Sequence, residues 1–319
     1  MAPRPRAPRT LLAALVVTSV VLPLAGAVRP AAVPAPAPAA LAPLRSATPA
    51  ALDARYRAAR DGIGAAERMA AGHGDRRRAA ALRVMAGAGR HFLSFDGRDG
   101  GRTAEVVGDL AHADRIAVLV PGSDTSLDKY GRFRAGAEAL QGEMGPRSAV
   151  VAWLGYPTPA TGSAGSLTTG RADRAAPQLD AFVGELSAAK PGARISVLCH
   201  SYGSVVCARA APELRADTLV LYGSPGTGAH DVGQLHTRAA VWAGRASGDW
   251  IADVPHLRLP LLVSTVGFGI DPVSTAFGAR VFDAGTGGHS DYLKPGSASL
   301  RAIALIASGR TPTEERHHA

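Results

Sequence analysis

Cysteine is scarce in this sequence, and the residue clusters that hold metals or nucleic acids are missing. The 319 residues include two cysteines, Cys199 and Cys207, and neither lies in a Cys/His quartet at metal-ligand spacing. No motif for an organic cofactor is present either, so we predict neither a metal nor a cofactor. Lysine and arginine form no basic face with interleaved aromatic residues, which argues against a nucleic-acid partner.

Long apolar runs are also missing, with one exception near the start of the chain. The run from Leu11 to Leu24 is shorter than the ~20 residues that a membrane-spanning helix needs. Arginines precede this run, and the small residues Ala25, Gly26 and Ala27 follow it. This pattern predicts a secretory signal peptide, residues 1–27, cleaved after Ala27, with an uncleaved membrane anchor as the alternative. We therefore expect a secreted protein, extracellular or associated with the cell envelope.

The rest of the composition suits one large α/β domain with extensions. Hydrophobic residues make up 46% of the chain and charged residues 19%, which is enough apolar material for a sizeable core. Loss of residues 1–27 removes three arginines and lowers the formal net charge from +9 to +6, which suits a soluble protein at an anionic cell wall. The chain after the signal peptide divides into an Ala/Pro-rich linker (28–48), a helical extension (49–89), the α/β domain (90–310) and a tail (311–319).

Strand and helix patterns alternate through the α/β domain. We predict strands at 91–95, 103–107, 115–120, 148–153, 195–198, 218–222, 239–243 and 279–282. We predict helices at 127–143, 171–188, 204–211 and 300–308, and two more within 49–89, broken near Gly72 to Gly74. Such alternation with apolar strands predicts a mostly parallel central sheet that helices cover on both faces.

The segment Arg194–Arg209 combines an apolar strand, an abrupt turn and a helix, with Ser201 at the apex of the turn. The pentapeptide resembles the G-x-S-x-G nucleophile elbow, in which a strained turn lifts a serine hydroxyl above the sheet edge. Cys199 stands at the first glycine position and Gly203 at the second. We predict that Ser201 is a catalytic nucleophile, with a serine in an ordinary strand-to-helix turn as the alternative.

A serine nucleophile needs a base, and the base needs an orienting acid. In the chain order Ser, Asp/Glu, His, the best base is His289, which lies on a glycine-rich loop between the last strand and the closing helix. An exposed loop histidine is the alternative. The other histidines fit less well: His200, with its side chain expected to point elsewhere, His230, His236 and His256, which lie between strands, and His317 and His318, in the tail.

The best acid is Asp249, which follows the strand 239–243. Asp253, Asp271 and Asp283 remain alternatives. The oxyanion needs two backbone N–H groups, and we predict those of Tyr202 and Ser123, with Gly122 allowing a close approach and Asp124 as the alternative donor.

Three further features have two interpretations each. The small, polar segment 161–170 is either a lid or an idle surface loop, and the aromatic residues Trp153, Tyr156 and Trp250 either line a pocket or belong to the core. Cys199 and Cys207 flank the elbow, and export permits a disulfide between them. Because sequence does not determine whether their Cα atoms come within ~7 Å, two buried thiols remain the alternative.

Six motifs together resemble a known family over about residues 90–293. They are V-L-V-P-G-S-D-T-S (118–126), W-L-G-Y-P-T-P (153–159), L-C-H-S-Y-G-S-V-V-C (198–207), A-G-R-A-S-G-D-W-I (243–251), F-G-I-D-P-V-S-T-A-F-G-A-R-V-F (268–282) and G-G-H-S-D-Y-L (287–293). The family is an α/β-hydrolase family of unknown function from high-GC Gram-positive bacteria. The resemblance implies the α/β-hydrolase fold and a Ser201–Asp249–His289 triad, and it implies no substrate. Cys199 departs from the usual glycine.

These features predict a secreted serine hydrolase that cleaves a carboxylic ester through an acyl-enzyme. Its expected substrate is a small molecule, a lipid or an acylated component of the cell envelope. Peptidase or amidase chemistry and acyl transfer are alternatives on the same triad. A catalytically inert cell-envelope binding protein on a hydrolase fold is the alternative of another class. The sequence predicts no oligomeric state.

Overall fold

The computed structural model of the chain describes residues 33–253, 259–260 and 265–312. The predicted signal peptide and the first part of the predicted linker lie outside these residues. His256, His317 and His318 lie outside them as well. Within the described residues, no helix combines the length and the apolar character that a membrane span requires.

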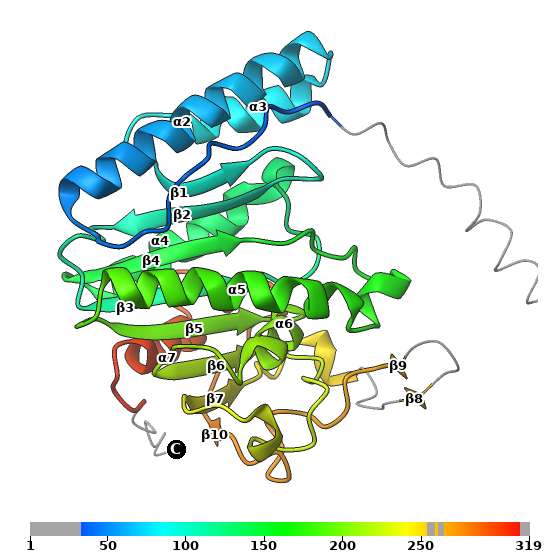
Figure 1. Cartoon of the computed structure of the whole chain (residues 1–319). Helices are drawn as coiled ribbons and strands as arrows, with labels where there is room; N and C mark the ends of the chain where they lie inside the picture. Colours follow the sequence, from blue (N-terminus) through cyan, green and yellow to red (C-terminus); the bar gives the residue numbers. More distant parts are fainter. Residues whose placement is uncertain (1–32, 254–258, 261–264, 313–319) are drawn as a thin grey trace, which may run out of the picture. The chain divides into compact units, whose positions relative to one another are not determined.

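Two helices precede the sheet, as predicted. Helix α2 (Pro49–Gly72) begins at Thr48, whose hydroxyl accepts a hydrogen bond from the Ala51 N–H, and α3 (Arg76–Met85) begins at Asp75, whose carboxylate caps the Arg78 N–H. The break between them contains Gly74, which has a φ of +86°. Helix α2 packs against the first strand of the sheet (Figure 1).

The central sheet has eight strands in the order β1-β2-β4-β3-β5-β6-β7-β10. The strands are β1 (His91–Asp96), β2 (Arg102–Gly108), β3 (Arg115–Val120), β4 (Ser148–Leu154), β5 (Arg194–His200), β6 (Thr218–Tyr222), β7 (Ala240–Gly244) and β10 (Arg280–Val281). The β1–β2 and β2–β4 pairs are antiparallel, and all other pairs are parallel. A second, two-stranded sheet joins β8 (Leu259–Pro260) to β9 (Thr265–Val266).

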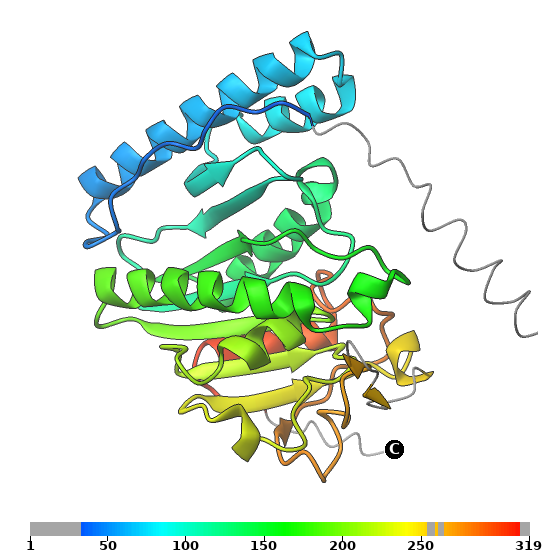
Figure 2. The same ribbon diagram turned by 45° about the vertical axis from the view of Figure 1, so that its right-hand side comes forward.

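Helices cover both faces of the large sheet. Figures 1 and 2 show α5 (Gly170–Ala189) and α6 (Gly203–Ala210) together on one face, with α4 (Tyr130–Met144) and α7 (Ala298–Ala307) on the other. This arrangement, with its N-terminal helical extension, confirms the predicted fold class. Short 3-10 helices occupy the loops: η1 (Leu127–Lys129), η2 (Ala164–Ser166), η3 (Gly233–Leu235) and η4 (Trp250–Asp253).

Two predicted elements differ in detail. The helix predicted at 127–143 begins as η1 and becomes α-helical at Tyr130. The last strand, predicted at 279–282, is reduced to Arg280–Val281, because this edge strand pairs with β7 alone and its side chains are exposed.

The central strands are apolar because both of their faces are covered. All seven residues of β4 are buried, and so are all five of β6. Since β3, β5, β6 and β7 run parallel, the loops that follow their carboxyl ends meet at one edge of the sheet. Each predicted site residue comes from a loop or turn at this edge or from the loop before α7.

Candidate active site

Ser201 occupies the apex of a strained turn between β5 and α6. Its φ is +51°, in the left-handed region that residues with a side chain seldom adopt. The Ser201 N–H donates to the Tyr222 carbonyl on the neighbouring strand at 3.0 Å, which holds the turn against the sheet. The residue is buried, with 8% of its surface exposed.

The strained turn requires glycine at two neighbouring positions. A Cβ on Gly203 would lie 2.6 Å from the Val120 carbonyl oxygen, and one on Gly122 would lie 2.6 Å from the Ser201 Cβ. Both distances are impossible for real side chains, so strand β3 and the turn after it approach the elbow through glycine. This accounts for the second glycine of the elbow motif and for the Pro121-Gly122 turn.

A disulfide joins Cys199 to Cys207, with 6.4 Å between their Cα atoms. Both side chains are fully buried. Cys199 is in β5, where it pairs with Val120 and Leu221, and Cys207 is in α6. The disulfide therefore connects the strand and the helix on either side of Ser201. Of the two alternatives compatible with the sequence, the structure contains the disulfide.

The structure brings Ser201, His289 and Asp249 together from three separate loops. His289 Nε2 lies 2.9 Å from Ser201 Oγ. His289 Nδ1 lies 2.8 Å from Asp249 Oδ1 and 3.0 Å from Oδ2. With Asp249 ionised, Nδ1 carries the proton and Nε2 is free to accept one from the Ser201 hydroxyl, an assignment that follows from the hydrogen-bond partners.

Asp249 is 2% exposed and keeps its charge through hydrogen bonds. Burial by itself raises the pKa of this carboxyl. Hydrogen bonds from His289, from the Tyr292 hydroxyl and from the Ile251 N–H outweigh burial, so the pKa of Asp249 lies below its usual value. The carboxylate is therefore ionised at neutral pH and available to orient His289.

Two residues of the site were not predicted from the sequence. The Tyr292 hydroxyl donates to Asp249 Oδ2 at 2.6 Å. His200 Nε2 lies 2.8 Å from the His289 carbonyl oxygen, and the two imidazole rings lie 4.8 Å apart. The last residue of β5 therefore packs against the loop that carries His289, and no hydrogen bond from the His200 side chain to Ser201 is among the described contacts. The only sequence signal for Tyr292 is its position in the motif G-G-H-S-D-Y-L.

The remaining candidates for base and acid have other contacts or are exposed. His230, His236, Asp253 and Asp283 are exposed. Asp271 forms an ion pair with Arg245 and accepts the N–H of Val273, as expected for a turn residue. Among the described residues, no group of three or more His, Cys, Asp or Glu side chains is arranged to hold a metal ion.

The predicted oxyanion donors belong to Tyr202, the residue after Ser201, and to Ser123, the residue after Gly122, which lies against Ser201. Within the described part of the chain, neither the Tyr202 N–H nor the Ser123 N–H has a hydrogen-bond acceptor. The Asp124 N–H donates to the Pro159 carbonyl at 2.9 Å, so this alternative donor is already engaged. Two backbone donors therefore remain beside Ser201, and their use in catalysis stays a prediction.

The side chain of Tyr202 holds the segment 161–170 in place. Its hydroxyl donates to the Thr168 carbonyl at 2.7 Å and accepts the Ala172 N–H at 3.2 Å. The Gly267 N–H also donates to the Leu167 carbonyl. The Thr168 contact attaches the segment to the residue that follows the nucleophile, and its action as a lid stays a prediction.

The three aromatic residues predicted near the pocket lie in different places. Trp250 is 49% exposed, and its ring lies 4.8 Å from that of His289. The Tyr156 hydroxyl donates to the Pro121 carbonyl, behind the turn that precedes Ser123. Trp153 lines a cavity elsewhere in the fold, so only Trp250 contacts the predicted triad.

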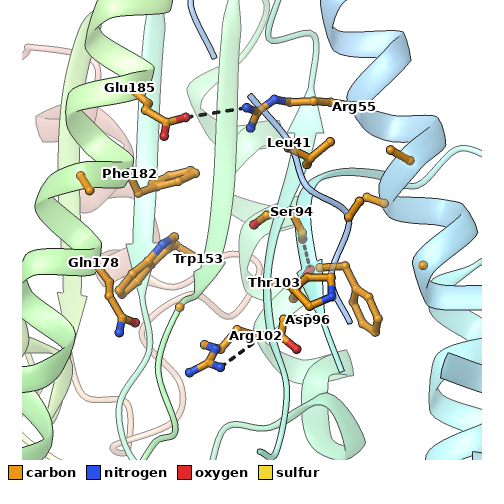
Figure 3. A pocket seen from close by; sticks show the side chains of 18 residues that line it. Leu41, Arg55, Ser94, Asp96, Arg102, Thr103, Trp153, Gln178, Phe182 and Glu185 are labelled. Atoms are coloured by element: carbon orange, nitrogen blue, oxygen red, sulfur yellow. Dashed lines mark hydrogen bonds and ion pairs between the residues drawn. The ribbon is translucent and has the colours of Figure 1, made fainter. Parts of the chain in front are cut away.

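Two cavities formed by described residues lie away from Ser201. One, of about 360 Å³, lies between α2, α5 and the sheet (Figure 3). Its ends carry the ion pairs Arg55–Glu185 and Arg102–Asp96, and Trp153 and Phe182 form an apolar wall. The other, of about 240 Å³, is lined by residues 156–160 and by the turn after β3, including Asp124. Neither contains a residue of the triad.

A family model described as "Alpha/beta hydrolase" matches residues 96–259. The match includes Ser201 and Asp249 and ends before His289. No curated protein matches the sequence.

Several solved structures are similar to this chain at low identity. An α/β serine hydrolase without a lid from Xanthomonas campestris shares 17% identity, with 71% of this chain and 97% of that chain covered and a TM-score of 0.44. The esterase LipW from Mycobacterium marinum shares 14% identity, with 76% and 88% covered and a TM-score of 0.40. Est1E from Butyrivibrio proteoclasticus shares 11% identity, with 70% and 100% covered and a TM-score of 0.43.

Proposed function

The chain belongs to the alpha/beta hydrolase family, and from this premise we propose that it is a serine hydrolase that cleaves carboxylic esters. One observation carries the proposal: the imidazole of His289 lies within hydrogen-bond distance of both Ser201 Oγ and the Asp249 carboxylate. A hydroxyl needs such a base to act as a nucleophile at neutral pH, and the base needs an acid that holds its tautomer.

In the first half of the reaction, Ser201 becomes acylated. Its Oγ attacks the ester carbonyl carbon, and the hydroxyl proton moves to His289 Nε2. Negative charge develops on the carbonyl oxygen, where the N–H groups of Tyr202 and Ser123 are the proposed donors. The carbon–oxygen bond to the alcohol then breaks, and His289 gives its proton to the departing oxygen. Asp249 stabilises the imidazolium between these two transfers.

In the second half, water releases the acid. His289 Nε2 takes a proton from a water molecule as the water oxygen attacks the acyl carbon. The bond to Ser201 Oγ then breaks, and His289 returns the proton to Oγ. The products are a carboxylic acid and an alcohol, and the enzyme regains its starting protonation state.

The expected substrate is an ester with an apolar group, such as a lipid or an acylated small molecule. Trp250 supports this choice, because its half-exposed ring lies against His289, where a substrate reaches Ser201. If the chain is exported, as the apolar run near its start predicts, the substrate is a component of the cell envelope.

A fluorophosphonate probe tests this proposal, because it reacts with activated serines only. We expect the wild-type protein to be labelled, the Ser201→Ala variant to remain unlabelled, and the control Ser247→Ala, at an exposed serine between β7 and Asp249, to label like the wild type. p-Nitrophenyl esters of increasing chain length then define the acyl group, with matched p-nitroanilides as the amide comparison. Absence of labelling in folded wild-type protein would sink the hydrolase proposal, and turnover of the anilides alone would exclude the esterase.

A further inference from the structure

The Asp249 carboxylate receives more hydrogen bonds than a catalytic acid needs to hold one histidine. His289 Nδ1 approaches both of its oxygens, and the Ile251 N–H donates to Oδ1 at 2.9 Å. The Tyr292 hydroxyl donates to Oδ2 at 2.6 Å, a distance typical of a hydrogen bond to a charged oxygen. Each carboxylate oxygen thus has a donor of its own besides the histidine.

The Tyr292 hydroxyl makes two hydrogen bonds, one as donor and one as acceptor. While it donates to Asp249, its oxygen accepts the Ala246 N–H at 3.1 Å. The side chain is 2% exposed. On the backbone of the same residue, the carbonyl accepts a hydrogen bond from the Ser299 hydroxyl at 2.8 Å, at the start of α7. The phenol has little freedom to rotate away from the carboxylate.

The sheet edge leaves room for this contact. Gly223, the residue after β6, has a φ of +56°, and a Cβ there would lie 3.0 Å from both Asp249 Oδ2 and Tyr292 Cε2. A side chain at this position would crowd both groups, and the positive φ also disfavours it. The chain therefore has glycine where the hydroxyl and the carboxylate meet.

We propose that Tyr292 is a positioning residue of the triad, which acts on Ser201 through Asp249 and His289. Its hydroxyl fixes the carboxylate in the orientation in which both oxygens lie within hydrogen-bond distance of His289 Nδ1. It also draws negative charge toward Oδ2 and so limits how strongly the carboxylate holds a protonated imidazole. This inference rests on the proposed hydrolase function.

Tyr292→Phe removes the hydroxyl alone and tests the inference. We expect kcat on a p-nitrophenyl ester to fall about 10-fold to 150-fold, the range of a hydrogen bond to a charged group, with KM within about 2-fold of the wild type. The acidic limb of the kcat/KM profile moves to higher pH, because more negative charge remains on the oxygens that face His289.

Tyr222→Phe is the matched control. The ring of Tyr222 lies 5.3 Å from that of Tyr292, and its hydroxyl makes no hydrogen bond to Asp249 among the described contacts. We expect this variant to keep the wild-type kcat and acidic limb. An equal loss in both variants would overturn the proposal, because it would reflect packing of the rings.

A double-mutant cycle separates positioning from a structural role. If Tyr292 acts through the carboxylate, Tyr292→Phe costs little further kcat in the Asp249→Asn background, whereas a full additional loss there overturns the proposal.

Should Tyr292→Phe fail to fold, 3-fluorotyrosine at position 292 keeps the donor and the fold. Wild-type kcat with an acidic limb at lower pH supports the proposal, and an unchanged limb overturns it. Ser201 labelling in the wild type shows that the hydrolase proposal stands independently of these results.

Discussion

Two carboxylates are buried in the described part of this fold with opposite kinds of partner. Glu105, in β2, is 1% exposed. Arg90 donates a hydrogen bond to each of its carboxylate oxygens, from Nε to Oε1 at 2.7 Å and from Nη2 to Oε2 at 2.6 Å. Asp249, after β7, is 2% exposed and meets a histidine, a tyrosine hydroxyl and a backbone N–H. Both carboxylates are fully engaged, yet only Asp249 lies beside an imidazole.

The difference shows how the partner of a buried acid separates a structural role from the catalytic role that we propose for Asp249. A guanidinium does not give up its proton in proteins, so the Arg90–Glu105 pair holds β2 to the start of β1 and does no proton chemistry. An imidazole changes its charge within the physiological range, so the Asp249–His289 pair can support proton transfer. We therefore expect loss of Glu105 to affect mainly stability, and loss of Asp249 to affect mainly rate.

Asp249→Asn is the change with the largest expected effect. The amide donates to His289 Nδ1 and so forces the proton onto Nε2, which can then no longer accept one from Ser201. In a serine triad this error lowers kcat about 10⁴-fold. We expect a loss of this order in p-nitrophenyl ester hydrolysis, with a thermal midpoint close to that of the wild type.

Asp253→Asn provides the control for this prediction. Asp253 ends η4, four positions after Asp249, and its side chain is exposed. The same exchange of a carboxylate for an amide there is expected to leave kcat unchanged. A loss below about 10-fold in Asp249→Asn would remove Asp249 from the role of orienting acid.

Glu105→Gln has the next largest effect, and we expect it to lower stability while leaving kcat nearly unchanged. The variant leaves Arg90, which is 8% exposed, without its opposite charge. Breaking one side of a buried ion pair costs about 3–5 kcal/mol of unfolding free energy. Urea denaturation measures this loss, and kcat of the folded variant should stay within about 2-fold of the wild type.

Glu138→Gln is the control for the ion pair. Glu138 pairs with Arg134, a second and more exposed partner of Glu105. Exposed pairs contribute about 0–1 kcal/mol, so this variant should be nearly as stable as the wild type. If Glu105→Gln lowered the unfolding free energy no more than Glu138→Gln, the buried Arg90–Glu105 pair would not stabilise the fold more than an exposed pair. The contrast between Glu105 and Asp249 would then fail.

The sequence predicted the sheet and the three residues of the proposed triad, but not the contacts that those residues make. Alternating strands and helices predicted the sheet, and the elbow motif with the chain order of acid and base selected Ser201, Asp249 and His289, which the structure brings together. The elbow motif and the strand before it are local signals, because both consist of adjacent residues in the sequence. The site residues themselves keep their catalytic roles as proposals.

The partners of the triad could not be predicted in the same way. The contact between Tyr292 and Asp249 joins two loops 43 positions apart, and that between His200 and His289 joins positions 89 apart. Such contacts depend on how the loops pack over the sheet edge, and no periodic pattern encodes that packing. The same holds for Cys199 and Cys207, whose spacing allowed both a disulfide and two thiols.

His200 is a half-buried ionisable group beside the triad, and its surroundings favour the neutral form instead of compensating a charge. Burial, and next to it the proximity of His289, lower the pKa of His200 to about 3. In the unfolded chain a histidine titrates near pH ~6.5. Between these values the unfolded state binds more protons than the folded state, so stability falls as the pH falls from about 6.5 toward 3.

The lowered pKa of Asp249 acts at lower pH. The stability that this carboxylate contributes is present above the pKa of an unfolded aspartate, about 3.9, and is lost as the pH falls below it.

His200→Gln tests this window with the smallest expected effect. Glutamine keeps a side-chain N–H for the His289 carbonyl but cannot be protonated. Between pH 7 and 5 the wild type should lose about 1–2 kcal/mol more unfolding free energy than the variant, and the difference should keep growing until the pH reaches about 3, the pKa of His200 in the folded protein. Urea titrations at pH 7, 6, 5 and 4 measure the difference. Parallel curves from pH 7 to 5 would mean that His200 accepts a proton in the folded state, and that the sheet edge beside Ser201 tolerates a positive charge at this position.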